Sequence, residues 1–199
     1  MESKRIIKLR TDLIKEIPFF PNNKATKEKL DKKKLSQLLI DFLSWKSRLI
    51  PHRKRTVKIN KNVNQKNSNI KSILCSQDFF TLKSKIENGE DINNYLSLKA
   101  HYEGYSPDSE KGNWWLDKDF ILNVMNFYHF HLIPYDKYCH ISTRSNQLIF
   151  AKVERELVEI IGIFDHSIFE EHSENPERKK LWRLWEKITT QNIPKGYAV

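Results

Sequence analysis

The chain has 199 residues, of which 39% are hydrophobic and 12% aromatic. This length fits a single domain, and the apolar content excludes a low-complexity or disordered chain. Lys and Arg outnumber Asp and Glu by 35 to 25, which gives a net charge of +10. That excess favours a polyanionic partner, nucleic acid before an anionic membrane surface, although a lysine-rich genomic composition would also explain it.

Signals for export and membrane insertion are missing from the sequence. The first residues contain no apolar leader segment, and no uncharged apolar run approaches the roughly 18 residues of a spanning helix. Cys75 and Cys139 are far apart and form no CxxC pair, which is typical of reduced thiols. We therefore expect a cytoplasmic protein with no membrane partner.

Residues 1–57 are expected to form an N-terminal helical part. The spacing of apolar residues in 4–20 leaves a short strand and a helical turn equally open. From Lys27 to Trp45, leucines recur at intervals of three and four residues, which predicts an amphipathic helix with Thr26 as its cap and Pro51 as its stop.

Residues 58–72 are rich in Asn and Lys and read as a flexible basic loop, the best candidate for an internal boundary. A second helical part follows over 73–127. Its expected helices are Phe79–Glu87, closed by Asn88-Gly89, then Asp91–Ala100 and Leu116–Phe127.

The apolar pattern then changes to the alternation of strands over 128–170. Tyr128–Ile133, Gln147–Val153 and Leu157–Phe164 are the expected strands, and the short segment between the last two predicts a hairpin. A final helix is expected over Glu177–Thr189, within 177–190. The fold class is therefore α+β: a helical N-terminal half, an antiparallel β-meander and a C-terminal helix.

His129 and His131 are the first candidates for chemistry. Residues two apart in a strand face the same side, so both imidazoles should project from one face while Phe130 and Leu132 pack on the other. Imidazoles exchange protons near neutral pH and serve as general acid and base. Two of them suit cleavage of an RNA phosphodiester, although two histidines on a half-exposed strand can also have no role.

Two further features accompany this pair. Arg144 stands directly before an apolar strand, where it could hold a phosphate, and Thr143 beside it offers a hydroxyl. The strand that ends at Phe164 is followed by Asp165 and His166. We select His129, His131, Arg144 and His166 as catalytic candidates and Thr143 as a substrate-binding candidate.

The segment 128–170 resembles the C-terminal meander of RelE/HigB-like ribonuclease toxins, in the barnase–EndoU–colicin–RelE fold group. The resemblance rests on an arginine entering an apolar strand, a short charged turn, a second apolar strand and a terminal Asp-His pair. Here these are Arg144, Leu148–Phe150, Glu154–Glu156, Val158–Phe164 and Asp165-His166.

The resemblance implies a metal-independent endoribonuclease that cleaves RNA by attack of the 2′-hydroxyl. It implies no cofactor, RNA as the substrate and an acidic inhibitor protein (an antitoxin) as the partner. It covers about a fifth of the chain, so the helical N-terminal half would be an addition to the toxin fold.

A basic arm follows the first long helix and could bind RNA as well. Arg48, Arg53 and Arg55 concentrate positive charge near Trp45, whose ring could stack on a base. A solvated loop after a helix end is the alternative for this arm.

Two other classes of function stay open. His129, His131 and His166, with Asp165, could ligate zinc or iron in a metal enzyme. A nucleic-acid-binding or regulatory protein without catalysis, in which the histidines are structural, is the other alternative.

Overall fold

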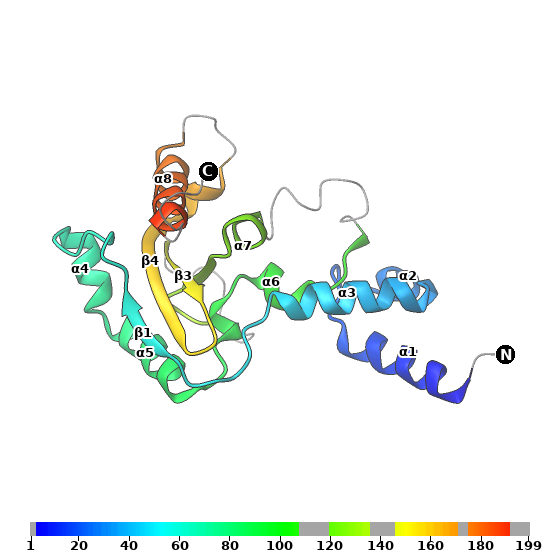
Figure 1. Cartoon of the computed structure of the whole chain (residues 1–199). Helices are drawn as coiled ribbons and strands as arrows, with labels where there is room; N and C mark the ends of the chain where they lie inside the picture. Colours follow the sequence, from blue (N-terminus) through cyan, green and yellow to red (C-terminus); the bar gives the residue numbers. More distant parts are fainter. Residues whose placement is uncertain (1–2, 108–119, 136–145, 171–174, 192–199) are drawn as a thin grey trace.

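The computed structural model describes residues 3–107, 120–135, 146–170 and 175–191. Over these residues, helices surround a four-stranded mixed sheet, with most helices before the sheet in sequence and one after it (Figure 1). The expected α+β class is confirmed.

The sheet consists of three antiparallel strands and one parallel strand. Its strands are β1 (Thr56–Ile59), β2 (Tyr128–His131), β3 (Gln147–Val153) and β4 (Leu157–Asp165), in the order β1-β4-β3-β2. The predicted β3–β4 hairpin is confirmed, and the Glu154 N–H closes its turn by donating to the Leu157 carbonyl over 2.8 Å. The parallel pairing of β1 with β4 was not expected from the sequence.

Helices cover both faces of this sheet, and α5 and α8 lie on opposite sides of β4 (Figure 1). One face packs against α4 (Ser68–Leu74), α5 (Gln77–Asn88), η1 (Asn93–Tyr95) and α6 (Leu98–Tyr102). The other packs against α7 (Phe120–Met125), η4 (His166–Phe169) and α8 (Pro176–Gln191). Successive side chains of each strand point to opposite faces of the sheet, so each strand contributes to both hydrophobic cores. Phe130 and Ile149 face α5, while Leu148 and Phe150 face α8.

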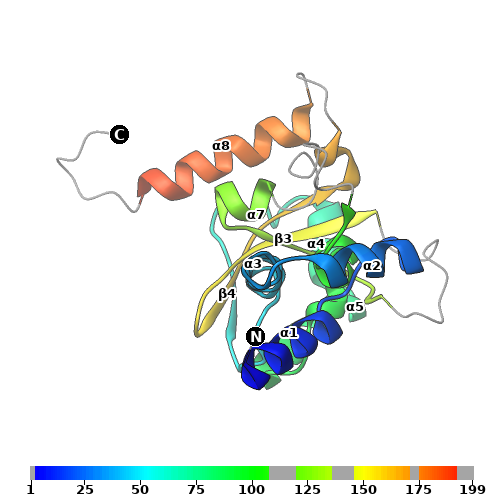
Figure 2. The same ribbon diagram turned by 90° about the vertical axis from the view of Figure 1, so that its right-hand side faces the viewer.

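The first three helices form a unit with its own small core. They are α1 (Lys4–Glu16), α2 (Lys24–Lys32) and α3 (Leu35–Ser47). Leu13, Leu30 and Leu38 meet in this core, which also takes in Tyr105 from the chain after α6. Figure 1 shows α1, α2 and α3 grouped to one side of the sheet, and in Figure 2, seen from that side, α3 lies in front of the strands.

The predicted continuous helix over Lys27–Trp45 is wrong, because the chain is extended at Lys33 and Lys34 between α2 and α3. No Pro or Gly marks this break. The cap of α2 is Asn23, whose side chain accepts from the Thr26 N–H over 2.9 Å, while Thr26 itself is buried. Residues 4–20, left open by the sequence, contain α1.

Residues 58–72 are not a structureless loop. β1 ends at Ile59 within the sheet, and Asn67 caps α4 by accepting from two backbone N–H groups. Asn60 donates its side-chain amide to Glu159 on β4 over 2.9 Å. The asparagines that suggested flexibility therefore act as turn and cap residues.

Other helix ends follow the sequence more closely. Gly89 ends α5 in the left-handed conformation, with φ of 77°, as Asn88-Gly89 predicts. The predicted helix over Asp91–Ala100 is instead η1 followed by α6, and Ser97 caps α6 through the Ala100 N–H. In the described parts of the chain, no helix has the length and apolar character needed to cross a bilayer.

Candidate functional site: a histidine cluster at the sheet

His129 and His131 lie on the same face of β2, as expected. Their ring centroids are 6.2 Å apart, and both rings lie on the side of the sheet that α7, η4 and α8 cover. Phe130 points to the opposite face and is fully buried in the core beneath α5. The two-residue period of the strand thus brings both imidazoles together.

His166 joins this pair from the far end of β4. Its ring centroid is 5.2 Å from that of His131, because β3 pairs with both strands and brings their ends together. The three residues His129, His131 and His166 form what we call the histidine cluster. The sequence predicted these three as site residues, and the structure brings them together.

Aromatic rings line the histidine cluster. His129 stacks on Phe150 at 5.8 Å, and Phe169 in η4 lies 5.2 Å from His129 and 6.2 Å from His166. His131 is only 5% exposed, His129 is half-buried and His166 is exposed. A substrate would therefore reach His166 and His129 first.

A backbone carbonyl fixes the tautomer of His166. Its Nδ1 lies 3.1 Å from the carbonyl oxygen of Asn146, and a carbonyl can only accept, so Nδ1 carries the proton. In the neutral ring Nε2 is then the basic nitrogen, with its lone pair available to accept a proton. Orientation by a backbone carbonyl is a common arrangement for imidazoles in acid–base sites.

Asp165 acts chiefly as a cap, and its interaction with His166 is weaker than its hydrogen bonds to Ser167. Its carboxylate accepts from the Ser167 N–H at 2.9 Å and from the Ser167 hydroxyl, and so caps η4. Hydrogen bonds from the Ser167 hydroxyl and backbone lower the pKa of Asp165, which stays ionised at neutral pH.

The two remaining candidates from the sequence, Thr143 and Arg144, lie outside the described residues. In the sequence Arg144 stands two positions before Asn146, whose carbonyl holds His166.

The basic arm does not form the expected RNA-binding surface, because its main side chains are buried. Trp45 is buried and its indole N–H donates to the His101 carbonyl over 3.0 Å. Arg48 is also buried and donates to the Glu103 carbonyl over 3.0 Å. Both side chains join α3 to the chain after α6, which leaves no exposed indole face for a base at Trp45.

Arg55 is buried too, and it binds three carbonyls, those of Pro51, Arg53 and Glu154, over 2.9–3.2 Å. Arg53 is exposed and pairs with Glu156 over 3.3 Å. Both arginines therefore lie at the β3–β4 turn, whereas His166 follows the other end of β4. Nine residues of strand separate them, about 30 Å at roughly 3.3 Å per residue, so these arginines cannot contact a phosphate held at the histidine cluster.

The metal hypothesis receives no geometric support from the part of the chain that is described. There, no three His, Cys, Asp or Glu side chains lie in an arrangement that could hold a metal ion. Asp165, the carboxylate expected to complete a ligand set, has its oxygen turned toward Ser167.

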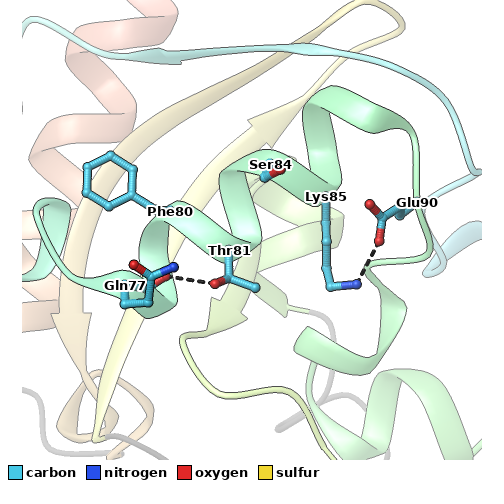
Figure 3. A pocket seen from close by; sticks show the side chains of 6 residues that line it. All are labelled: Gln77, Phe80, Thr81, Ser84, Lys85 and Glu90. Carbon is cyan, nitrogen blue, oxygen red and sulfur yellow. Dashed lines mark hydrogen bonds and ion pairs between the residues drawn. The ribbon is translucent and has the colours of Figure 1, made fainter.

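A surface depression of about 430 Å³ lies elsewhere, along the outer side of α5 (Figure 3). Its charged groups, Lys85 and Glu90, pair with each other over 2.7 Å. Its hydroxyl at Thr81 donates to the Gln77 carbonyl of the same helix over 2.8 Å. Since these groups already have partners, the depression is a weaker candidate site than the histidine cluster.

Sequence reasoning missed Phe169 and Asn146, which both contact the histidine cluster. Phe169 follows His166 by three positions, and a one-turn spacing after a strand end could have drawn attention to it. Asn146 acts through its backbone carbonyl, which any residue would supply, so no sequence signal identifies it.

Comparison with known proteins found no matching family model, no matching curated protein and no matching solved structure.

Proposed function

We propose that this protein is a metal-independent endoribonuclease of the toxin type, with the histidine cluster as its active site. The observation that carries the proposal is the convergence of three imidazoles from β2 and the end of β4, at ring separations of 5.2 and 6.2 Å. Two imidazoles side by side can supply the base and the acid that phosphodiester cleavage requires.

In the proposed reaction one imidazole accepts the proton of a ribose 2′-hydroxyl. The 2′-oxygen attacks phosphorus, the bond from phosphorus to the 5′-oxygen breaks, and a second, protonated imidazole donates its proton to that oxygen. The products are a 2′,3′-cyclic phosphate and a free 5′-hydroxyl. Arg144 would stabilise the charge on the phosphate, and Thr143 would bind the substrate.

His129 and His166 are the proposed acid and base, because both are accessible and His131 is not. The Asn146 carbonyl leaves Nε2 of His166 as the proton acceptor in the neutral ring. His131 is proposed as a positioning residue, since its ring contacts those of both neighbours.

The toxin class brings two further proposals, which rest on the resemblance of residues 128–170. The protein would act in the cytoplasm, and an acidic inhibitor protein would bind it there. The net charge of +10 is complementary to such a partner.

The test is RNA cleavage in the presence of a metal chelator by His129→Gln and His166→Gln variants. Each substitution should lower the cleavage rate by about 100-fold or more, the usual contribution of a general acid or base. His52→Gln is the matched control, because His52 is exposed and lies outside the histidine cluster. Cleavage at the wild-type rate by both cluster variants would contradict the proposal.

A second candidate is a nucleic-acid-binding protein without catalysis. The burial of His131 and the stacking of His129 on Phe150 favour it, because both are features of histidines that serve packing. This candidate predicts that RNA is bound but stays intact during prolonged incubation with the wild-type protein.

A further inference from the structure

The net positive charge of this protein arises within its first 57 residues. Residues 1–57 contain 16 Lys or Arg and six Asp or Glu, which gives +10. The remaining residues, 58–199, contain 19 of each kind and are neutral in sum. The whole excess charge of the chain therefore belongs to the segment that contains α1, α2, α3 and the basic arm.

This division argues against genomic composition as the cause of the charge. A bias toward lysine codons would act along the whole chain, yet residues 58–199 balance their lysines with acidic residues. Since self-repulsion within one small unit costs stability, an uncompensated charge there indicates a polyanionic partner.

On α1 the cations form a stripe on the exposed side. Lys4, Lys8 and Lys15 fall within about 40° of one another around the helix, at 3.6 residues per turn. Leu13, which is buried against α3, lies on the opposite side. The stripe extends over about 16 Å at roughly 1.5 Å per residue, a length that can contact several phosphates of an extended strand.

On α2, lysine side chains occupy much of the exposed surface of the helix. Thr26 and Leu30 are buried, while four lysines are exposed: Lys24, Lys27, Lys29 and Lys32. Only Lys24 of these four pairs with an acidic group among the described residues, at 3.9 Å from Glu28. Most of the charge on α2 is thus available to an external anion.

On α2 the distribution of apolar side chains favours nucleic acid over a lipid surface. A helix that lies in a membrane interface buries an apolar face between its cations. No large hydrophobic side chain of α2 is exposed, because Leu30 is buried in the core that α1, α2 and α3 share. On α1, Ile6, Ile7 and Leu9 are exposed, so vesicle binding is measured beside RNA binding in the experiment below.

We propose that α1 and α2 form the surface that holds the sugar–phosphate backbone of RNA. The assignment rests on the proposed substrate class and moves RNA binding from the basic arm, where Arg48 and Arg55 are buried, to the exposed lysines of these two helices. Lysine ammonium groups on a helix surface contact phosphates without reading bases, so binding is independent of sequence.

The experiment measures binding of a 2′-O-methyl oligoribonucleotide, which lacks the attacking hydroxyl and cannot be cleaved by the proposed reaction. Binding therefore tests this surface even if the protein does not cleave RNA. Lys4, Lys8, Lys27 and Lys29 are replaced by Gln together. Between about 50 and 200 mM salt, the slope of log affinity against log salt should fall by about 2 to 3, since each phosphate contact on a single strand contributes roughly 0.7.

The matched control replaces four exposed lysines of the neutral part by Gln: Lys58, Lys61, Lys66 and Lys71. It removes the same charge and should keep the wild-type slope. Equal loss in both variants, or loss in neither, would overturn the proposal. The proposal would also be overturned if the α1 and α2 variant kept its RNA affinity but no longer bound vesicles of phosphatidylcholine and phosphatidylserine.

A measurement on the unaltered protein covers the case of a variant that does not fold. Lysines are acetylated with and without the oligonucleotide and then quantified by mass spectrometry. Protection should concentrate on the lysines of α1 and α2. Protection spread evenly over the chain, or confined to residues 58–199, would contradict the assignment.

Discussion

At the scale of single residues, the histidines of this protein differ in their surroundings. His166 is exposed and oriented by a carbonyl, whereas His131 is buried among aromatic rings. His101, outside the histidine cluster, contacts Tyr102 at 4.4 Å, and its buried Nδ1 has no hydrogen-bond partner among the described residues. Burial lowers the pKa of His101, although Asp91 opposes that effect.

This environment predicts a pH-dependent stability. Because the pKa of His101 is lower in the folded state, the unfolded chain binds the proton first, and stability falls as pH drops below about 6.5. Thermal unfolding of the wild type and of His101→Gln, measured between about pH 5 and 7.5, should show a flatter pH dependence for the variant. Parallel curves would show that His101 does not contribute.

At the scale of elements, the parallel strand β1 depends on one arginine. The Arg55 side chain directly precedes β1 and donates to the carbonyls of Pro51, Arg53 and Glu154, which joins the strand to the β3–β4 turn. Burial lowers the pKa of this guanidinium. Its planar group can donate to several carbonyls at once, which an ammonium cannot do with the same geometry.

Arg55→Lys should therefore destabilise the protein almost as much as Arg55→Ala, by about 2–3 kcal/mol. Equilibrium unfolding in urea measures the difference. Arg53→Lys is the matched control at an exposed position and should stay within about 0.5 kcal/mol of the wild type. A fully stable Arg55→Lys variant would show that the positive charge alone, and not the planar guanidinium group, holds β1 in place.

The elements also show what the sequence could predict. The antiparallel strands were predicted because alternation and the short turn are local signals. β1 was missed, since Thr56–Ile59 is a short segment whose partner, β4, lies about 100 residues along the chain. The break between α2 and α3 was missed because Lys33 and Lys34, where the backbone is extended, carry no helix-ending signal in the sequence.

The candidate site was predictable in part for the same reason. The two-residue period of a strand places His129 and His131 together, and the hairpin places His166 near them. The burial of Arg48, Arg55 and Trp45 could not be predicted, because it depends on carbonyls of Glu103, Glu154 and His101 that no sequence pattern identifies.

At the scale of the whole molecule, charge and candidate chemistry belong to different parts. The sheet and its flanking helices carry the histidine cluster within a neutral segment, while α1 and α2 carry the excess positive charge. The proposed account assigns cleavage to the first part and backbone binding to the second. It predicts that substitutions in the histidine cluster leave RNA binding by α1 and α2 intact.

The central claim is that the histidine cluster cleaves RNA through the 2′-hydroxyl without a metal ion. The most direct test incubates the wild-type protein, in a chelating buffer, with an RNA oligonucleotide and with its fully 2′-O-methylated counterpart. The account predicts that only the unmodified RNA is cut and that its fragments end in 2′,3′-cyclic phosphate. Intact RNA, or equal cleavage of both oligonucleotides, would contradict it.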